Sequence, residues 1–267
     1  MESSDRQNLE QALAKTEADA AATLKAANAM MGPLRRFRAA AKAGNLRELH
    51  SSIEAAEKAI DVFRQQFTNA KEGWDFDEER YFASGLYPTE IITTGQQMGV
   101  SIFERDDRLY CYPVLIRVSP NDKAVFIDKK RENRIRPSVL VTRLKELQRK
   151  PPPFRTEAFL EALFKAYSKA VAMRGSDLLQ MAPVIRLIDI YELLTLLPGQ
   201  AREYSKQEFA RDIYLLHRSG VDATRTGAKV SFPFTGRARS KTLTVIDETG
   251  EEKRYYGICF TQTSKEQ

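Results

Sequence analysis

Residues 46–67 read LRELHSSIEAAEKAIDVFRQQF, and their apolar side chains recur at alternating intervals of three and four residues. The stripe consists of Leu46, Leu49, Ile53, Ala56, Ile60, Phe63 and Phe67. This spacing is a heptad seam, which predicts an α-helix that packs lengthwise against another helix. The pair Gly44-Asn45 stands just before the seam and is typical of a break between two helices.

The residues before that break show a second helical stripe with many small side chains. It consists of Leu9, Leu13, Thr16, Ala20, Leu24, Ala27, Met31 and Leu34. Alanine and threonine bury little area, so this helix needs a close partner. Two antiparallel helices in one chain and a bundle formed by two chains satisfy that need equally well. We expect Gly32-Pro33 to kink or break the first helix, and Gly73 to end the helical region.

The middle of the chain, residues 73–150, changes to short runs of β-branched and aromatic residues separated by polar turns. The predicted strands are Val100–Glu104, Leu109–Val118 and Lys123–Ile127. They predict a small antiparallel meander, in which Pro113 should split the long second run. A basic helix should follow, with Pro137 near its first turn.

The run Pro151-Pro152-Pro153 is the clearest boundary in the sequence and predicts a separate unit over residues 151–267. We expect a helix from Thr156 to about Met173, a second from Asp189 to Leu197, and a third that ends at Gly220. The third helix begins with Ser205-Lys206-Gln207-Glu208, a capping box. Short β-like segments follow it.

In residues 157–260 the predicted order is helix, short strand, helix, turn, helix and β-hairpin, which resembles the winged helix-turn-helix family. The fold class expected is therefore α+β, mainly α. It has a helical hairpin or coiled coil at 1–72, a small β meander and basic helix at 73–150, and a winged-helix-like domain at 151–267.

The third helix of this domain has two predicted faces. Phe209, Ile213 and Leu216 fall on one side, and the other side carries Gln207, Arg211, Tyr214 and Arg218. The resemblance implies that this second face enters the major groove of DNA. The alternative without a DNA-binding role is an amphipathic surface helix with an ordinary polar outer face.

Positive charge is concentrated in two segments of a chain whose formal net charge is +6. The candidate nucleic-acid-binding residues in the first segment are Lys129, Lys130, Arg131, Arg134 and Arg136, and those in the second are Arg225, Lys229, Arg237, Arg239 and Lys241. Clustered cations attract phosphate backbones, and the resemblance makes the loop with Arg237 a wing that touches phosphates or the minor groove.

Three functions are consistent with the predicted elements and the two basic segments. The leading one is a DNA-binding accessory or regulatory protein, with double-stranded DNA as partner and helices 5–70 for self-association or a partner protein. The second is a non-catalytic interaction subunit of a DNA-maintenance or phage-defence complex. We expect a cytoplasmic protein with no membrane span, catalytic residue, cofactor or metal.

The third function is a Mg²⁺-dependent nuclease, suggested by Asp122, Asp128 and Lys130 around the strand 123–127. In nucleases of that type two carboxylates hold the metal ion. Here the two aspartates should stand at opposite ends of the strand, roughly 20 Å apart at about 3.3 Å per residue. Only a distant acid such as Glu90 would rescue a shared metal site.

Overall fold

The computed structural model of the chain describes residues 8–105, 108–150, 154–175, 182–233 and 242–262. It confirms the α+β, mainly α fold class, with long N-terminal helices and small antiparallel sheets. Contacts divide the chain into two compact units. The first comprises residues 1–95, 118–125 and 132–142, and the second 96–117, 126–131 and 143–267. Within the described part of the chain, no helix is long and apolar enough to cross a membrane.

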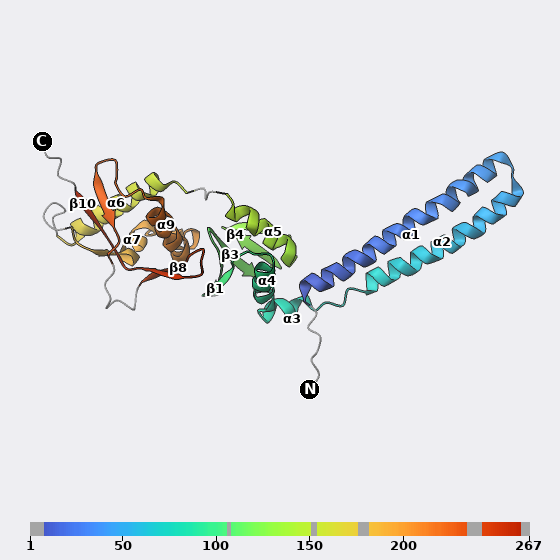
Figure 1. Cartoon of the computed structure of the whole chain (residues 1–267), viewed down its shortest axis with the longest axis horizontal. Helices are drawn as coiled ribbons and strands as arrows, with labels where there is room; N and C mark the ends of the chain where they lie inside the picture. The colour runs from blue at the N-terminus through green and yellow to red at the C-terminus, as the bar shows by residue number, and fades with distance from the viewer. Residues whose placement is uncertain (1–7, 106–107, 151–153, 176–181, 234–241, 263–267) are drawn as a thin grey trace, which may run out of the picture. The chain divides into compact units, whose positions relative to one another are not determined.

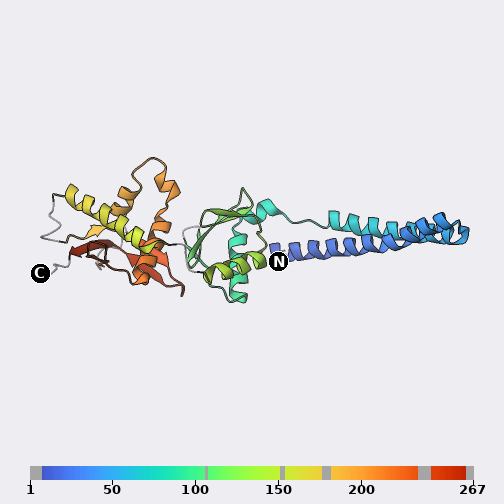
Figure 2. The same ribbon diagram turned by 90° about the horizontal axis from the view of Figure 1, so that it is seen from above.

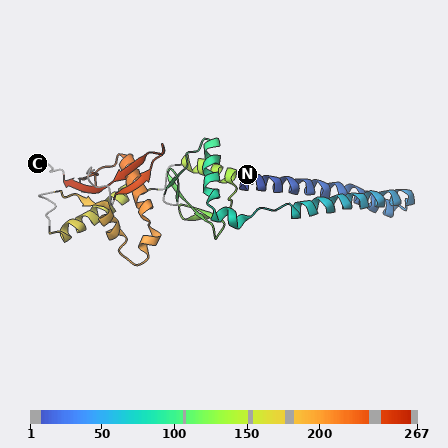
Figure 3. The same cartoon turned by 90° about the horizontal axis from the view of Figure 1, so that it is seen from below.

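Two long helices form an antiparallel hairpin in the first unit. α1 (Leu9–Ala43) and α2 (Leu46–Glu72) lie side by side along their lengths (Figures 1, 2 and 3). Gly44 takes the left-handed conformation, with φ 72°, that ends α1. The Asn45 side chain then accepts a hydrogen bond from the N–H of Glu48 and starts α2. Of the two partners expected for the first helix, the structure therefore contains the intrachain one.

α1 continues without a break through Gly32 and Pro33, so a break at this pair was the wrong expectation. A proline in a helix removes one backbone hydrogen bond and crowds the preceding turn. α1 nevertheless stays helical here, where α2 runs alongside it.

Small side chains make up the seam between the two helices. The buried residues along the paired stretch are Ala26 and Ala40 on α1 and Ser52 and Ala56 on α2. Leu9 and Ala12 are also buried, but they lie at the start of α1, beyond the end of α2, which is level with Lys15. Thr23 Oγ1 donates a hydrogen bond of 3.1 Å to the carbonyl oxygen of Gln66 across the seam. The seam between the helices therefore consists mostly of small groups, with Phe63 of α2 half-buried along it. The exposed members of the predicted stripes, Leu24, Met31, Leu46 and Phe67, lie outside the seam.

Two short helices that the sequence analysis missed follow the hairpin: α3 (Glu78–Ala83) and α4 (Leu86–Gln97). Glu90 on α4 accepts hydrogen bonds from the N–H groups of Leu9 (3.0 Å) and Glu10 (2.9 Å). These N–H groups at the start of α1 have no partner within the helix, so a carboxylate from 80 residues away caps it.

A five-stranded meander with the strand order β1-β2-β3-β4-β5 comes next. Its strands are β1 (Phe103–Arg105), β2 (Arg108–Cys111), β3 (Val114–Ser119), β4 (Ala124–Ile127) and β5 (Lys130–Glu132). The turn at Pro113 separates β2 from β3, as the sequence predicted. The basic helix α5 (Pro137–Gln148) begins at the predicted proline.

The remainder of the second unit combines helices with two small sheets. Its elements are α6 (Thr156–Met173), β6 (Ile185–Arg186), α7 (Leu187–Leu194), α8 (Gln200–Glu203), α9 (Lys206–Ser219), β7 (Ala228–Ser231), β8 (Leu243–Ile246), β9 (Glu252–Tyr255) and β10 (Gly257–Gln262). The strand orders are β6-β10-β7 and β8-β9. Leu163, Tyr167, Ile190, Phe209 and Phe260 belong to one buried core that joins these helices and strands.

Candidate nucleic-acid interface

Helix α9 begins where the sequence placed it. The Ser205 side chain accepts from the N–H of Glu208, and the Glu208 carboxylate accepts from the N–H of Ser205 at 2.8 Å. This capping box satisfies two backbone donors that have no partner within the helix. Gly220, with φ 72°, terminates the helix. The rotation of α9 about its axis, and thus the direction of each side chain, is set by the packing described next.

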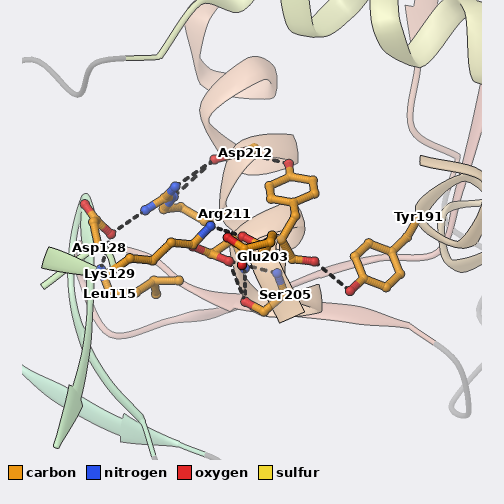
Figure 4. Close-up of polar contacts among 10 residues, drawn as sticks. Leu115, Asp128, Lys129, Tyr191, Glu203, Ser205, Arg211 and Asp212 are labelled. Atoms are coloured by element: carbon orange, nitrogen blue, oxygen red, sulfur yellow. Dashed lines mark hydrogen bonds and ion pairs between the residues drawn. The ribbon is translucent and has the colours of Figure 1, made fainter. Parts of the chain in front are cut away.

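Arg211 lies between two carboxylates (Figure 4). Its Nη1 is 2.6 Å from Oδ1 of Asp128, which stands in the turn between β4 and β5, and its Nε is 3.1 Å from Oδ1 of Asp212. Burial acts to lower the pKa of Arg211, but the two carboxylates outweigh burial and raise this pKa. The Arg211 side chain is only 18% exposed, so its charge is balanced by carboxylates of the same chain.

The two aspartates have further partners of their own. Asp128 Oδ1 also accepts from the N–H of Leu115 at 3.0 Å, and Asp212 Oδ2 accepts from the hydroxyl of Tyr204 at 2.7 Å. Burial raises the pKa of Asp212, although Arg211 and Tyr204 both act to lower it. Burial and the neighbouring Asp212 raise the pKa of the Tyr204 hydroxyl. We refer to Asp128, Arg211, Asp212 and Tyr204 as the arginine network.

Lys129 extends the same contact from the next position in the β4–β5 turn. Its Nζ lies 3.2 Å from Oε1 of Glu208 and donates to the carbonyl oxygen of Glu203 (Figure 4). Two residues predicted to bind nucleic acid, Lys129 and Arg211, are thus brought together, but each meets carboxylates of its own chain.

The C-terminal end of α9 is engaged in the same way. Tyr214 is buried, and its hydroxyl donates to Glu248 Oε2 at 2.8 Å. Arg218 forms an ion pair with Glu248, and its guanidinium carbon lies 5.6 Å from the ring centre of Tyr112. The Tyr112 and Tyr214 rings meet edge to face at 5.5 Å. The arginine is therefore held by a carboxylate and by aromatic faces.

This packing corrects the prediction that the polar side of α9 is free to meet a partner. Arg211 and Tyr214 were predicted to project outward together, but the first is ion-paired and the second is buried. Elements distant in sequence cover that face, because it contacts β8 and the turns that hold Tyr112, Asp128 and Glu248. Gln207, at the first turn of α9, is half-buried.

The other predicted residues are scattered. Arg134 pairs with Glu132 at 2.8 Å, and in the first unit Arg136 pairs with Glu10 at 2.7 Å. The side chains of Lys130, Arg131, Arg225 and Lys229 face solvent, and so does that of Arg134, which is 69% exposed despite its ion pair. Arg237, Arg239 and Lys241, the predicted wing, lie outside the described residues.

Asp128, the aspartate considered for a nuclease, is used as an ion-pair and hydrogen-bond acceptor in the arginine network. Among the described residues, no group of three or more His, Cys, Asp or Glu side chains is placed to hold a metal ion.

A basic cluster that was not predicted from the sequence lies at the end of the α1–α2 hairpin. It consists of Arg35, Arg36, Arg38, Lys42 and Arg47, all of them exposed. No ion pair involving these side chains occurs among the residues that the structure describes. A signal was present, because the sequence contains no acidic residue from Ala20 to Arg47. We call these five residues the hairpin-end cluster.

No protein-family model matches this chain, and no curated protein or solved structure is significantly similar to it.

Proposed function

We propose that the chain is a non-catalytic accessory protein that works by association, and that one flank of the α1–α2 hairpin binds a second copy of the chain. The exposure of large apolar side chains on this hairpin carries the proposal. Leu24 is 64% exposed, Leu46 67% and Phe67 53%. Side chains of this kind are normally buried, and a row of them on one surface is typical of a binding face.

Helical geometry places these residues on one flank. Leu24 follows the seam residue Thr23 by one position, and Phe67 follows Gln66 by one position. One residue turns a helix by about 100°. In an antiparallel pair of helices, the residue that follows a seam residue lies on the same side of the pair in both helices. Leu24 and Phe67 therefore share a flank. The hydrogen bond between Thr23 and Gln66 puts them at the same level.

The same flank continues toward the end of the hairpin. Met31 lies seven residues beyond Leu24, and Ile60 lies seven before Phe67, so these two also share a level. Met31 is 43% exposed and Ile60 is half-buried. We call the surface formed by Leu24, Met31, Leu46, Ile53, Ile60 and Phe67 the apolar flank.

The size of the apolar flank suits a second hairpin. α2 has 27 residues, which corresponds to a length of about 40 Å at roughly 1.5 Å per residue. A pair of helices is about 20 Å wide, so the flank offers about 800 Å² on each copy, or about 1,600 Å² in all. That total is typical of a stable specific interface, and two hairpins joined in this way form a four-helix bundle.

The DNA-reading role predicted for α9 is left out of this proposal. Arg211 is held by Asp128 and Asp212, and Arg218 is held by Glu248. Presenting either arginine to DNA would break contacts within the chain.

The experiment is a mass measurement on the full chain. Sedimentation equilibrium over about 1–100 μM should show a monomer–dimer equilibrium. A monomer at every concentration would overturn the proposed self-association, and the apolar flank would then be left for a different protein.

A further inference from the structure

The hairpin-end cluster places five cations on the last turns of a two-helix hairpin. Arg35, Arg36, Arg38 and Lys42 stand on the end of α1, and Arg47 stands in the first turn of α2. The nearest acid along the chain is Glu48, and the next toward the N-terminus is Asp19. In contrast, Lys129, Arg134 and Arg136 in the other basic segment are all neutralised by carboxylates. The end of the hairpin therefore carries five cations against one acid, Glu48, and remains strongly positive.

Three of these side chains form a row. Arg35, Arg38 and Lys42 are three and four residues apart, so they line one face of α1 over a rise of roughly 10 Å. Neighbouring phosphates along one DNA strand are separated by several ångströms, so a row of this length spans about two of them. Arg36 and Arg47 lie beside the row, within reach of further phosphates.

The residue types favour phosphate. Four of the five cations are arginines, whose planar guanidinium makes paired hydrogen bonds to phosphate oxygens. Between them, residues 39–45 are four alanines, one lysine, one glycine and one asparagine. Such small side chains leave the end of the hairpin slender, so that a phosphate backbone can approach the cations closely.

A membrane surface fits this end less well. Hairpins that insert into lipid carry tryptophan, phenylalanine or leucine at the inserted end. The turn of this hairpin, Ala39 to Asn45, contains none of them, and the exposed residues of these types beside it are Phe37 (37%) and Leu46 (67%), which stand among the cations. Single-stranded nucleic acid also fits less well, because proteins bind it by stacking bases on exposed aromatic rings, and Phe37 is only 37% exposed.

We infer that the hairpin-end cluster is a binding site for the phosphate backbone of double-stranded DNA, without base recognition. The inference rests on Arg35, Arg36, Arg38, Lys42 and Arg47. None of these is among the apolar side chains that carry the proposed self-association, although Arg35, Arg38 and Lys42 continue the Leu24–Met31 face of α1 toward the turn. The site holds DNA by charge alone, so its affinity falls steeply as salt is added.

The test uses the full chain and a fluorescein-labelled 30-base-pair duplex of arbitrary sequence, with anisotropy read at 50, 100 and 200 mM NaCl. The wild-type chain should bind, with an affinity that falls with salt and does not depend on duplex sequence. The triple variant Arg35→Gln/Arg36→Gln/Arg38→Gln should bind at least about tenfold more weakly at 50 mM NaCl. Its slope of log affinity against log salt should be smaller by about 2 to 3, since each phosphate contact contributes about 0.9.

The matched control is Lys58→Gln/Arg64→Gln/Lys71→Gln, which removes the same charge from exposed positions on α2 away from the cluster. It should bind the duplex within about threefold of wild type. Far-ultraviolet circular dichroism should show equal helix content in all three proteins. Equal losses in the two triple variants would overturn the inference, because net charge alone would then explain binding.

Two further results would also overturn it. One is no binding by the wild-type chain at 50 mM NaCl. The other is loss of binding to vesicles containing 30% phosphatidylserine in the Arg35/Arg36/Arg38 variant, with duplex binding unchanged. That pattern would assign the cluster to a membrane surface. Arg35 and Arg38 lie four and seven residues beyond Met31 on the same face of α1, so sedimentation equilibrium is measured on the same variants. Weaker duplex binding with an unchanged dimer dissociation constant separates this site from the proposed self-association.

Discussion

The guanidinium of Arg211 lies 2.6 Å from the carboxylate of Asp128, and the two residues are 83 positions apart in the sequence. One stands in a turn of the β meander and the other in the middle of α9. Helical periodicity alone would direct Arg211 to solvent. The ion pair instead turns this arginine toward the protein, so this side of α9 makes a contact within the chain.

Replacing Arg211 by methionine should lower the free energy of unfolding by about 2 kcal/mol, because it leaves Asp128 and Asp212 facing each other without a cation. Urea unfolding followed by circular dichroism measures the loss. The control is Arg254→Met, because Arg254 is 50% exposed and its partner Glu252 keeps a second arginine, Arg105, so this change should cost less than about 0.5 kcal/mol. Equal losses in the two variants would show that the arginine network adds no stability of its own.

Glu10 should make the first unit sensitive to acid. Burial acts to raise its pKa, but hydrogen bonds from the N–H of Ser138 and from Arg136 outweigh burial and hold this pKa below its usual value of 4.5. The unfolded chain then takes up the proton more readily than the folded chain. The stabilisation is therefore complete above pH 4.5 and is lost as the pH falls through the lower folded value.

The variant Glu10→Gln should consequently lower the free energy of unfolding by about 1 kcal/mol at pH 7, and the difference from wild type should shrink below about pH 4. Thermal unfolding at pH 7, 5 and 3.5 tests this. Glu17→Gln serves as control, because Glu17 also meets Arg136 but is 70% exposed. A Glu10→Gln effect that stays constant across this pH range would contradict the argument.

Local patterns in the sequence predicted the elements whose causes are local. The break at Gly44-Asn45, the Ser205–Glu208 capping box and the turn at Pro113 were all found this way. Each depends on a few adjacent residues, because caps and turns are satisfied within one or two turns of chain.

The residues that cover α9 could not be predicted from local sequence patterns. Its periodicity identified Phe209 and Ile213 as buried, but Tyr112, Asp128 and Glu248 cover the opposite side. An amphipathic pattern reveals that a helix has one apolar face, and it does not reveal a second, polar contact made by distant residues. The hairpin-end cluster was visible as a run without acids, but only the folded chain shows that its cations form no ion pair with other described residues.

Gly250 should be among the least replaceable glycines of the second unit. Its φ is 86°, and a Cβ at this position would lie 2.4 Å from Cε1 of the Phe103 ring. Gly250→Ala should cost about 2–3 kcal/mol, from backbone strain together with displacement of that ring. Gly199 has the same φ but open space around it, so Gly199→Ala should cost only about 1 kcal/mol. Chemical unfolding of both variants gives the comparison, and equal costs would exclude a contribution from the Phe103 contact.

The apolar flank should control the oligomeric state of the chain. The double variant Leu24→Glu/Phe67→Glu puts two charges at one level of the flank, and removing such charges from water on dimer formation is costly. Its dimer dissociation constant should rise at least about tenfold, as measured by sedimentation equilibrium. Val62→Glu is the control, because Val62 is 55% exposed but precedes the seam residue Phe63 by one position and so lies on the other flank. If Val62→Glu disrupted the dimer while Leu24→Glu/Phe67→Glu did not, the association surface would have to be moved to that other flank.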